Sequence, residues 1–101
     1  MTKEEHLLVC LSEECAEVIK EVNKALRFGL DDVHPRKITT NRENIESELN
    51  DLYGVLEFLG ESGLLFERDS MAITKKKEKV KHYIEYAVWN GTVTGERAGL
   101  K

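Results

Sequence analysis

Two pairs of acidic residues share one spacing, and they are the part of this sequence best suited to chemistry. Glu14 and Glu17 lie three residues apart, as do Glu48 and Asp51, each pair within a stretch of helical apolar periodicity. Residues three apart on an α-helix are neighbours on its surface, so two such helices side by side would gather four carboxylates. Clustered carboxylate oxygens are ligands that Mg²⁺ and Mn²⁺ prefer, and bound Mg²⁺ usually acts on phosphates. The spacing therefore points to a nucleotide enzyme.

Three helices are predicted to position these acids, and no segment has a clear β-strand periodicity. The predicted helices run from the capping-box pair Thr2 and Glu5 to about Phe28, from the capping-box pair Thr40 and Glu43 to about Gly60, and from near Ser70 to about Trp89. The predicted fold class is all-α, a small bundle of three main helices. Residues 1–90 are expected to form one domain, with a flexible tail over residues 91–101.

The apolar residues of each predicted helix recur at intervals of three and four, which predicts the buried faces. The predicted inward residues are Leu7, Leu8, Leu11, Cys15, Val18, Val22 and Leu26 in the first helix, Ile45, Leu49, Leu52, Leu56 and Leu59 in the second, and Ile73, Val80, Tyr83, Ile84, Ala87 and Val88 in the third. At about 100° per residue, Glu14 is expected just beside its stripe, Glu48 inside its own, and Asp51 at the border. The alternative is that these acids are boundary residues that pair with lysines or reach solvent.

Composition restricts the class of protein. The chain has 101 residues, enough for one domain, and 34% of them are charged. A net charge of −4 argues against duplex nucleic acid as the main partner, because phosphate binding needs a basic surface. No apolar run approaches a membrane span, and the start of the chain does not resemble a signal peptide. Cys10 and Cys15, five residues apart, are expected to stay reduced, which fits a cytoplasmic protein.

Lysines are the candidate phosphate contacts. With Val80 inward, Lys76 falls beside the apolar stripe of the third helix, whereas most of the lysines around it point outward. Lys24 lies two turns after Glu17 on the same side of the first helix, where it would contact phosphate or form a salt bridge with Glu21. The alternative is a solvated face with lysine stems lying over the core. Tyr83 could stack on a base, although aromatic residues at helical spacing more often belong to a core.

The acid pairs also resemble a known family. Glu13-Glu14-Cys15-Ala16-Glu17, followed by Glu48-Leu49-Asn50-Asp51, is similar to the E-E-x-x-E and E-x-x-D motifs of MazG-like nucleoside triphosphate pyrophosphohydrolases, in the all-α NTP pyrophosphatase superfamily. The segments 24–30 and 79–86 resemble short bacteriophage and bacterial members. The resemblance covers roughly residues 7–86. The stretch between Glu17 and Glu48 is long for this family, so the loop and the substrate choice are not carried over.

This resemblance implies a reaction and a set of roles. Glu14, Glu17, Glu48 and Asp51 match the four metal ligands, with Mg²⁺ as the cofactor and Mn²⁺ as a substitute. Glu13 matches the first acid of the motif, a ligand for an additional metal or a base for water. Through the same resemblance, which includes the segment 79–86, Lys79 is a further candidate phosphate contact. The implied reaction converts a nucleoside triphosphate into a monophosphate and pyrophosphate.

Assembly is expected to complete the bundle, because three helices of this length do not easily bury all their apolar faces alone. Leu64, Leu65 and Phe66 add a further apolar patch in a connector. A homodimer or homotetramer is therefore predicted, and the family is similarly oligomeric. Two rival classes stay open. One is a non-catalytic helical interaction module, and the other is a carboxylate metal-binding protein without hydrolytic activity.

Overall fold

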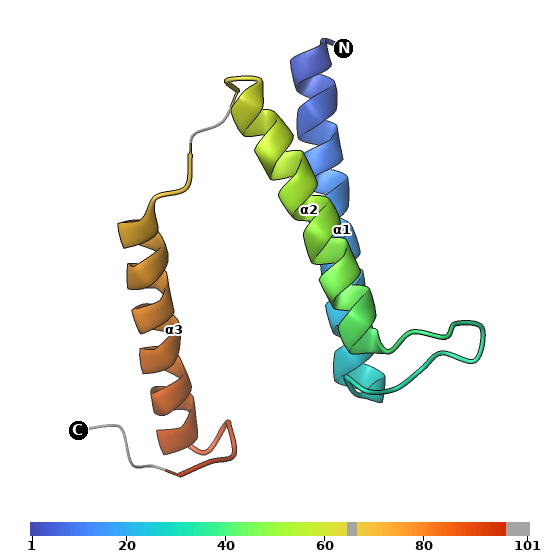
Figure 1. The fold of residues 1–101 in the computed structure, drawn as a ribbon. Helices are drawn as coiled ribbons and strands as arrows, with labels where there is room; N and C mark the ends of the chain where they lie inside the picture. Colours follow the sequence, from blue (N-terminus) through green and yellow to red (C-terminus); the bar gives the residue numbers. More distant parts are fainter. Residues whose placement is uncertain (65–66, 97–101) are drawn as a thin grey trace. The chain divides into compact units, whose positions relative to one another are not determined.

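The computed structural model describes residues 1–64 and 67–96, and these residues form three α-helices (Figure 1). They are α1 (Lys3–Phe28), α2 (Asn41–Glu61) and α3 (Ser70–Trp89). Within the described ranges, extended backbone pairs in one isolated bridge between Val33 and Thr40. The predicted all-α class is confirmed. Of the helices described, none is both long enough and apolar enough to cross a membrane.

Contacts divide the chain into two compact units, one ending at Phe66 and the other beginning at Glu67. The first unit is a hairpin in which α1 and α2 run antiparallel, side by side, joined by a long loop (Figure 1). The second contains α3. In the predicted apolar connector, Leu64 is half-buried, whereas Leu65 and Phe66 lie outside the described residues.

Side-chain caps explain where the hairpin helices begin. The Thr2 hydroxyl accepts the Glu5 backbone N–H at 3.0 Å. At α2, Thr40 and Glu43 form the reciprocal pair: the Thr40 hydroxyl accepts the Glu43 N–H at 3.1 Å, and the Glu43 carboxylate accepts the Thr40 N–H at 3.0 Å. The Thr40 hydroxyl also donates to the Glu43 carboxylate at 3.1 Å, and the pKa of Glu43 is lowered first by the backbone bond from the Thr40 N–H and then by this side-chain bond. Both predicted starts are therefore confirmed.

The loop between the helices is fastened to the first turn of α2. Gly29 ends α1 with φ of 101°, a conformation that favours glycine, and its carbonyl accepts a hydrogen bond from the Asn41 side chain at 2.8 Å. The Asn41 N–H donates to the Asp32 carbonyl at 3.0 Å, and the Arg42 N–H donates to the Leu30 carbonyl at 2.8 Å. Asn41 is 3% exposed, so this polar residue is part of the interior. The loop is held in a defined position beside the helix ends.

The face of α1 that packs on α2 is rotated from the predicted stripe. The residues of α1 that are half-buried or buried are Leu7, Cys10, Leu11, Glu14, Val18, Glu21, Lys24 and Ala25. Leu8, Cys15, Val22 and Leu26 were predicted inward and are exposed. The prediction followed hydrophobicity alone, whereas the packed face includes two glutamates and a lysine.

The other two predicted stripes are confirmed in part. On α2, Ile45, Leu49 and Leu52 are half-buried and Leu59 is fully buried, but Leu56 is exposed. On α3, Val88 is buried and Ala87 is half-buried, whereas Ile73, Val80, Tyr83 and Ile84 are exposed. A single helix cannot bury a whole stripe within its own unit, which is why most of that prediction fails.

The chain stays hydrogen-bonded after α3. The N–H groups of Thr92 and Val93 donate to the Ala87 carbonyl at 2.9 and 3.0 Å, and the Thr92 hydroxyl donates to the Asn90 side chain at 2.6 Å. The segment after Trp89 therefore begins with a hydrogen-bonded turn, and the flexibility of the tail stays a prediction. The end of that predicted tail, residues 97–101, lies outside the described part of the chain.

Candidate metal centre between α1 and α2

Three of the predicted acids meet where the two hairpin helices pack. Glu14 of α1 and Glu48 and Asp51 of α2 each place a carboxylate oxygen within 4.8 Å of the others. Glu14 and Glu48 are half-buried, whereas Asp51 is exposed. The cluster is therefore set into the helix interface and open to solvent on one side.

The local packing explains how these acids are held. Glu14 lies one turn from Leu11 and from Val18 on α1, and all three are half-buried. It lies within the packed face, whereas the sequence predicted a position just beside it. Glu48 lies between Ile45 and Leu52 on the inner face of α2, as predicted. Because Glu14 lies within α1, and Glu48 and Asp51 lie within α2, the helical backbone limits the positions that their carboxylates can adopt.

Electrostatics in the cluster disfavour the charged form of Glu48. Burial raises the pKa of Glu48, and the charges of Asp51, Glu17, Glu14 and Glu21 raise it further. Clustered carboxylates repel, and a group among them binds its proton more strongly than it does in water. A divalent cation would relieve the same repulsion, because hard oxygen ligands are those that Mg²⁺ and Mn²⁺ prefer.

The raised pKa of Glu48 predicts how metal-free stability depends on pH. The native state holds this proton more strongly than the unfolded chain, whose pKa is near 4.5, so the contribution is full below that value. It is lost as the pH rises through the native pKa. In EDTA, Glu48→Gln should therefore gain melting temperature over the wild type as the pH rises above about 4.5. Circular dichroism melts test this, and a difference that stays constant with pH would contradict it.

The other two acids of the family motif are placed differently. Glu17 is exposed and does not belong to the group within 4.8 Å, although its charge is among those that raise the pKa of Glu48. Glu13 is exposed on α1. The structure thus gathers three of the four predicted ligands, with Glu17 close enough to act electrostatically on Glu48.

Glu21 was not predicted as a site residue and belongs beside this cluster. It is 4% exposed, and its charge also acts on Glu48. Its Oε1 atom pairs with Lys24 Nζ at 3.3 Å, while its buried Oε2 atom has no hydrogen-bond partner among the described residues. An unpaired buried carboxylate oxygen is costly, so this atom is suited to a cation or an ordered water. The signal in the sequence was that Glu21 follows Glu14 by seven residues, about two helical turns, which places both on the same side of α1.

Two outcomes were predicted for Lys24, and the structure has the salt bridge with Glu21. The lysine side chain is 29% exposed, so it is half-buried at the edge of the helix interface. The pair keeps one positive charge next to the carboxylates. A contact of Lys24 with phosphate stays a prediction.

The remaining candidates lie on α3. Lys76, Lys79 and Tyr83 are exposed there, and the Tyr83 ring lies 5.8 Å from the ring of His82. They follow one another at intervals of three and four, so they lie along one side of the helix. Their proposed contacts with substrate stay predictions.

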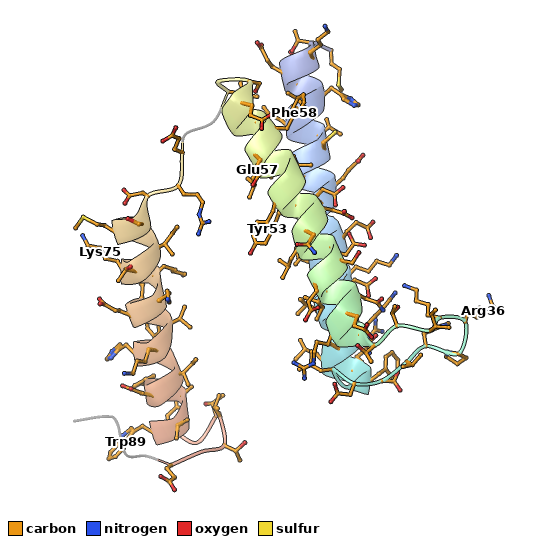
Figure 2. The ribbon with its side chains drawn as sticks, in the orientation of Figure 1. Arg36, Tyr53, Glu57, Phe58, Lys75 and Trp89 are labelled. Carbon is orange, nitrogen blue, oxygen red and sulfur yellow. The ribbon has the colours of Figure 1, made fainter. Side chains whose placement is uncertain are left out.

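A large cavity lies at the end of the hairpin where α1 begins and α2 ends. It has a volume of about 600 Å³ and is lined by residues 1–4, His6, Leu7, Phe58 and Ser62. Figure 2 shows Phe58 near this end of α2. None of the clustered acids lines this cavity, so it is not the candidate metal site despite its volume.

Comparisons of the chain with protein-family models, curated proteins and solved structures gave no match. No family is therefore assigned from them. The resemblance to MazG-like enzymes continues to depend on the two acid motifs, of which the structure places three carboxylates together. Both cysteines are free, in agreement with the prediction that they do not pair.

Proposed function

We propose that this protein is a Mg²⁺-dependent nucleoside triphosphate pyrophosphohydrolase of the MazG-like type. One observation carries the proposal: carboxylate oxygens of Glu14, Glu48 and Asp51 lie within 4.8 Å of one another on two packed helices. All three belong to the two motifs that resemble this family. Mn²⁺ would be a substitute for Mg²⁺, since both prefer such ligands.

The donor set fits the proposed ion. Three carboxylates and the unpaired Oε2 atom of Glu21 are all hard oxygen donors. When bound, Mg²⁺ acidifies a water and neutralises charge on the triphosphate. Glu14 and Glu48 would hold the ion from the half-buried side, and the exposed Asp51 leaves the solvent side accessible to substrate. Glu17 is next to the group and would complete the set.

In the proposed reaction, the oxygen of water forms a bond to the α-phosphorus. The bond from that phosphorus to the bridging oxygen breaks, and pyrophosphate leaves with the electron pair. A neighbouring carboxylate takes the proton of the attacking water, and the exposed Glu13 is the candidate for this role. Lys24 would face the departing phosphates, with Lys76 and Lys79 as further contacts and Tyr83 near the base.

The active protein is proposed to be a homodimer or homotetramer in the cytoplasm of a bacterium or of a phage-infected host. The support for assembly is a second apolar face of α1, on which Leu8, Ile19 and Leu26 are exposed. Exposed apolar side chains in a row along one helix are typical of an interface. The biological role would be control or cleaning of the nucleotide pool.

The proposal is tested by incubating a panel of dNTPs and NTPs with the protein in Mg²⁺ and in excess EDTA. Monophosphate should accumulate only in Mg²⁺, and Mg²⁺ should also raise the melting temperature through binding linkage. Full-rate hydrolysis in EDTA would contradict the metal centre. A Mg²⁺-dependent melting shift without any product would favour a metal-binding protein, and neither effect would favour a helical interaction module.

A further inference from the structure

A basic cavity of about 250 Å³ lies where the C-terminal end of α1, the following loop and the start of α2 meet. Lys24, Arg27 and Lys37 line it, together with His34. Asp32 is the acid among the lining residues, against three cations, of which Lys24 is paired with Glu21. In a chain with a net charge of −4, this gathering of cations favours an anionic ligand.

The neutral polar groups of the cavity also present hydrogen-bond donors. The Nδ1 atom of His34 accepts the Arg36 backbone N–H at 3.0 Å, so the proton of the neutral ring lies on Nε2. Asn44 also lines the cavity, and its Oδ1 atom accepts the Thr39 hydroxyl at 2.6 Å. Its NH₂ group remains to donate. Ring, amide, guanidinium and ammonium donors together match the oxygens of a phosphate.

The backbone of the α2 N-terminus takes no part in this donor set. The N–H groups of Asn41 and Arg42 donate to loop carbonyls, and the Glu43 N–H donates to the Thr40 hydroxyl. Binding at the cavity must therefore come from side chains. This makes the site sensitive to single substitutions, each of which removes a charge without disturbing a helix cap.

The cavity adjoins the carboxylate cluster along both helices. On α1, Lys24 lines the cavity and pairs with Glu21 at 3.3 Å. On α2, Asn44 precedes Glu48 by four residues, which is about one helical turn or 5.4 Å. A ligand held by metal at the carboxylates would thus reach the cavity within about one turn of helix.

We propose that the basic cavity is a binding site for a phosphate group. Resting on the proposed function, this group is the terminal phosphoryl group of the triphosphate, which leaves as part of pyrophosphate. Arg27 and Lys37 supply the charge that Lys24 alone cannot, since Lys24 is shared with Glu21. The substrate would lie along the hairpin from the metal centre towards the loop.

Pyrophosphate is the probe, titrated into the full chain in excess EDTA and followed by NMR. Saturable shifts should appear at the Arg27 and Lys37 amides, the His34 ring and the Asn44 side-chain amide. Arg27→Ala/Lys37→Ala should weaken binding by about tenfold or more, because it removes two charged donors. Both residues are exposed, so the variant is expected to fold, and circular dichroism verifies this.

Lys20→Ala/Arg36→Ala is the matched control. It removes the same two charges from exposed positions that do not line the cavity, and Figure 2 shows Arg36 at the outer end of the loop. Equal weakening in both double variants, or no saturable binding by the wild type, would overturn the cavity proposal. Binding in EDTA without hydrolysis in Mg²⁺ would support the cavity and contradict the proposed reaction. Hydrolysis in Mg²⁺ without pyrophosphate binding in EDTA would support the proposed reaction and contradict the cavity proposal.

Discussion

Glu48→Gln is expected to lower Mg²⁺-dependent hydrolysis of nucleoside triphosphates by about 100-fold or more while leaving the helices intact. The exchange removes a ligand charge at nearly constant volume, and even outer partners of a metal typically cost 10- to 100-fold. Asp51→Asn should behave alike, since its carboxylate is in the same group within 4.8 Å. Initial rates at saturating Mg²⁺ measure the loss, with circular dichroism to verify folding.

Glu46→Gln is the matched control for these variants. Glu46 is exposed on the same helix and lies about 160° around it from Glu48, so it should keep near wild-type activity. In EDTA, Glu48→Gln should also be at least as stable as the wild type near neutral pH, because it removes a repelling charge. Normal turnover by either ligand variant would remove that residue from the proposed centre.

Lys24→Ala is expected to destabilise the metal-free protein by about 2 kcal/mol, between the costs of breaking a surface pair and a buried one. The substitution leaves Glu21 buried at 4% exposure without its partner at 3.3 Å. Its second oxygen already has no partner in the described part of the chain. Urea unfolding in EDTA, followed by circular dichroism, measures this loss.

Two variants make this prediction sharper. Lys20→Ala removes a charge from an exposed position on the same helix and should cost far less. Glu21→Gln in the Lys24→Ala background should recover part of the loss, because a neutral amide costs less to bury than a carboxylate. If Lys24→Ala and Lys20→Ala were equally stable, the Glu21 pair would not stabilise the hairpin. Mg²⁺ should restore stability to Lys24→Ala if Glu21 contributes to the metal centre.

Helix positions could be predicted from the sequence because their signals are local. Thr2, Thr40 and Asp69 each accept a backbone N–H three residues on, and such caps fix where a helix begins. Gly29 ends α1 with positive φ, where a side chain would be strained. The starts of the helices, and hence the positions of the acid pairs, follow from a few residues around each cap.

Helix faces were harder to predict, since hydrophobicity does not say which side meets a partner. Leu8, Val22 and Leu26 are as apolar as the residues that pack, yet they are exposed, while Glu14 and Glu21 face α2. A charged residue on a packed face is favourable only through what it meets there, such as Lys24 or the acids of the other helix. Those partners come from tertiary contacts, which periodicity along one helix does not contain.

The basic cavity illustrates the same limit. Its wall joins the end of α1 to His34 and Lys37 in the loop and to Asn44 on α2. The loop is placed by the buried Asn41 side chain, which donates to the Gly29 carbonyl. Nothing in the spacing of these residues predicts that one asparagine anchors the loop and brings the cations together.

The central claim is that this chain directs water to the α-phosphorus of a nucleoside triphosphate. It is tested most directly by running the Mg²⁺ reaction in ¹⁸O-labelled water and locating the label by mass spectrometry. The account predicts one labelled oxygen in the nucleoside monophosphate, unlabelled pyrophosphate, and no reaction in EDTA. Label in pyrophosphate, or direct release of labelled orthophosphate with a nucleoside diphosphate, would contradict it even if the carboxylates proved to bind metal.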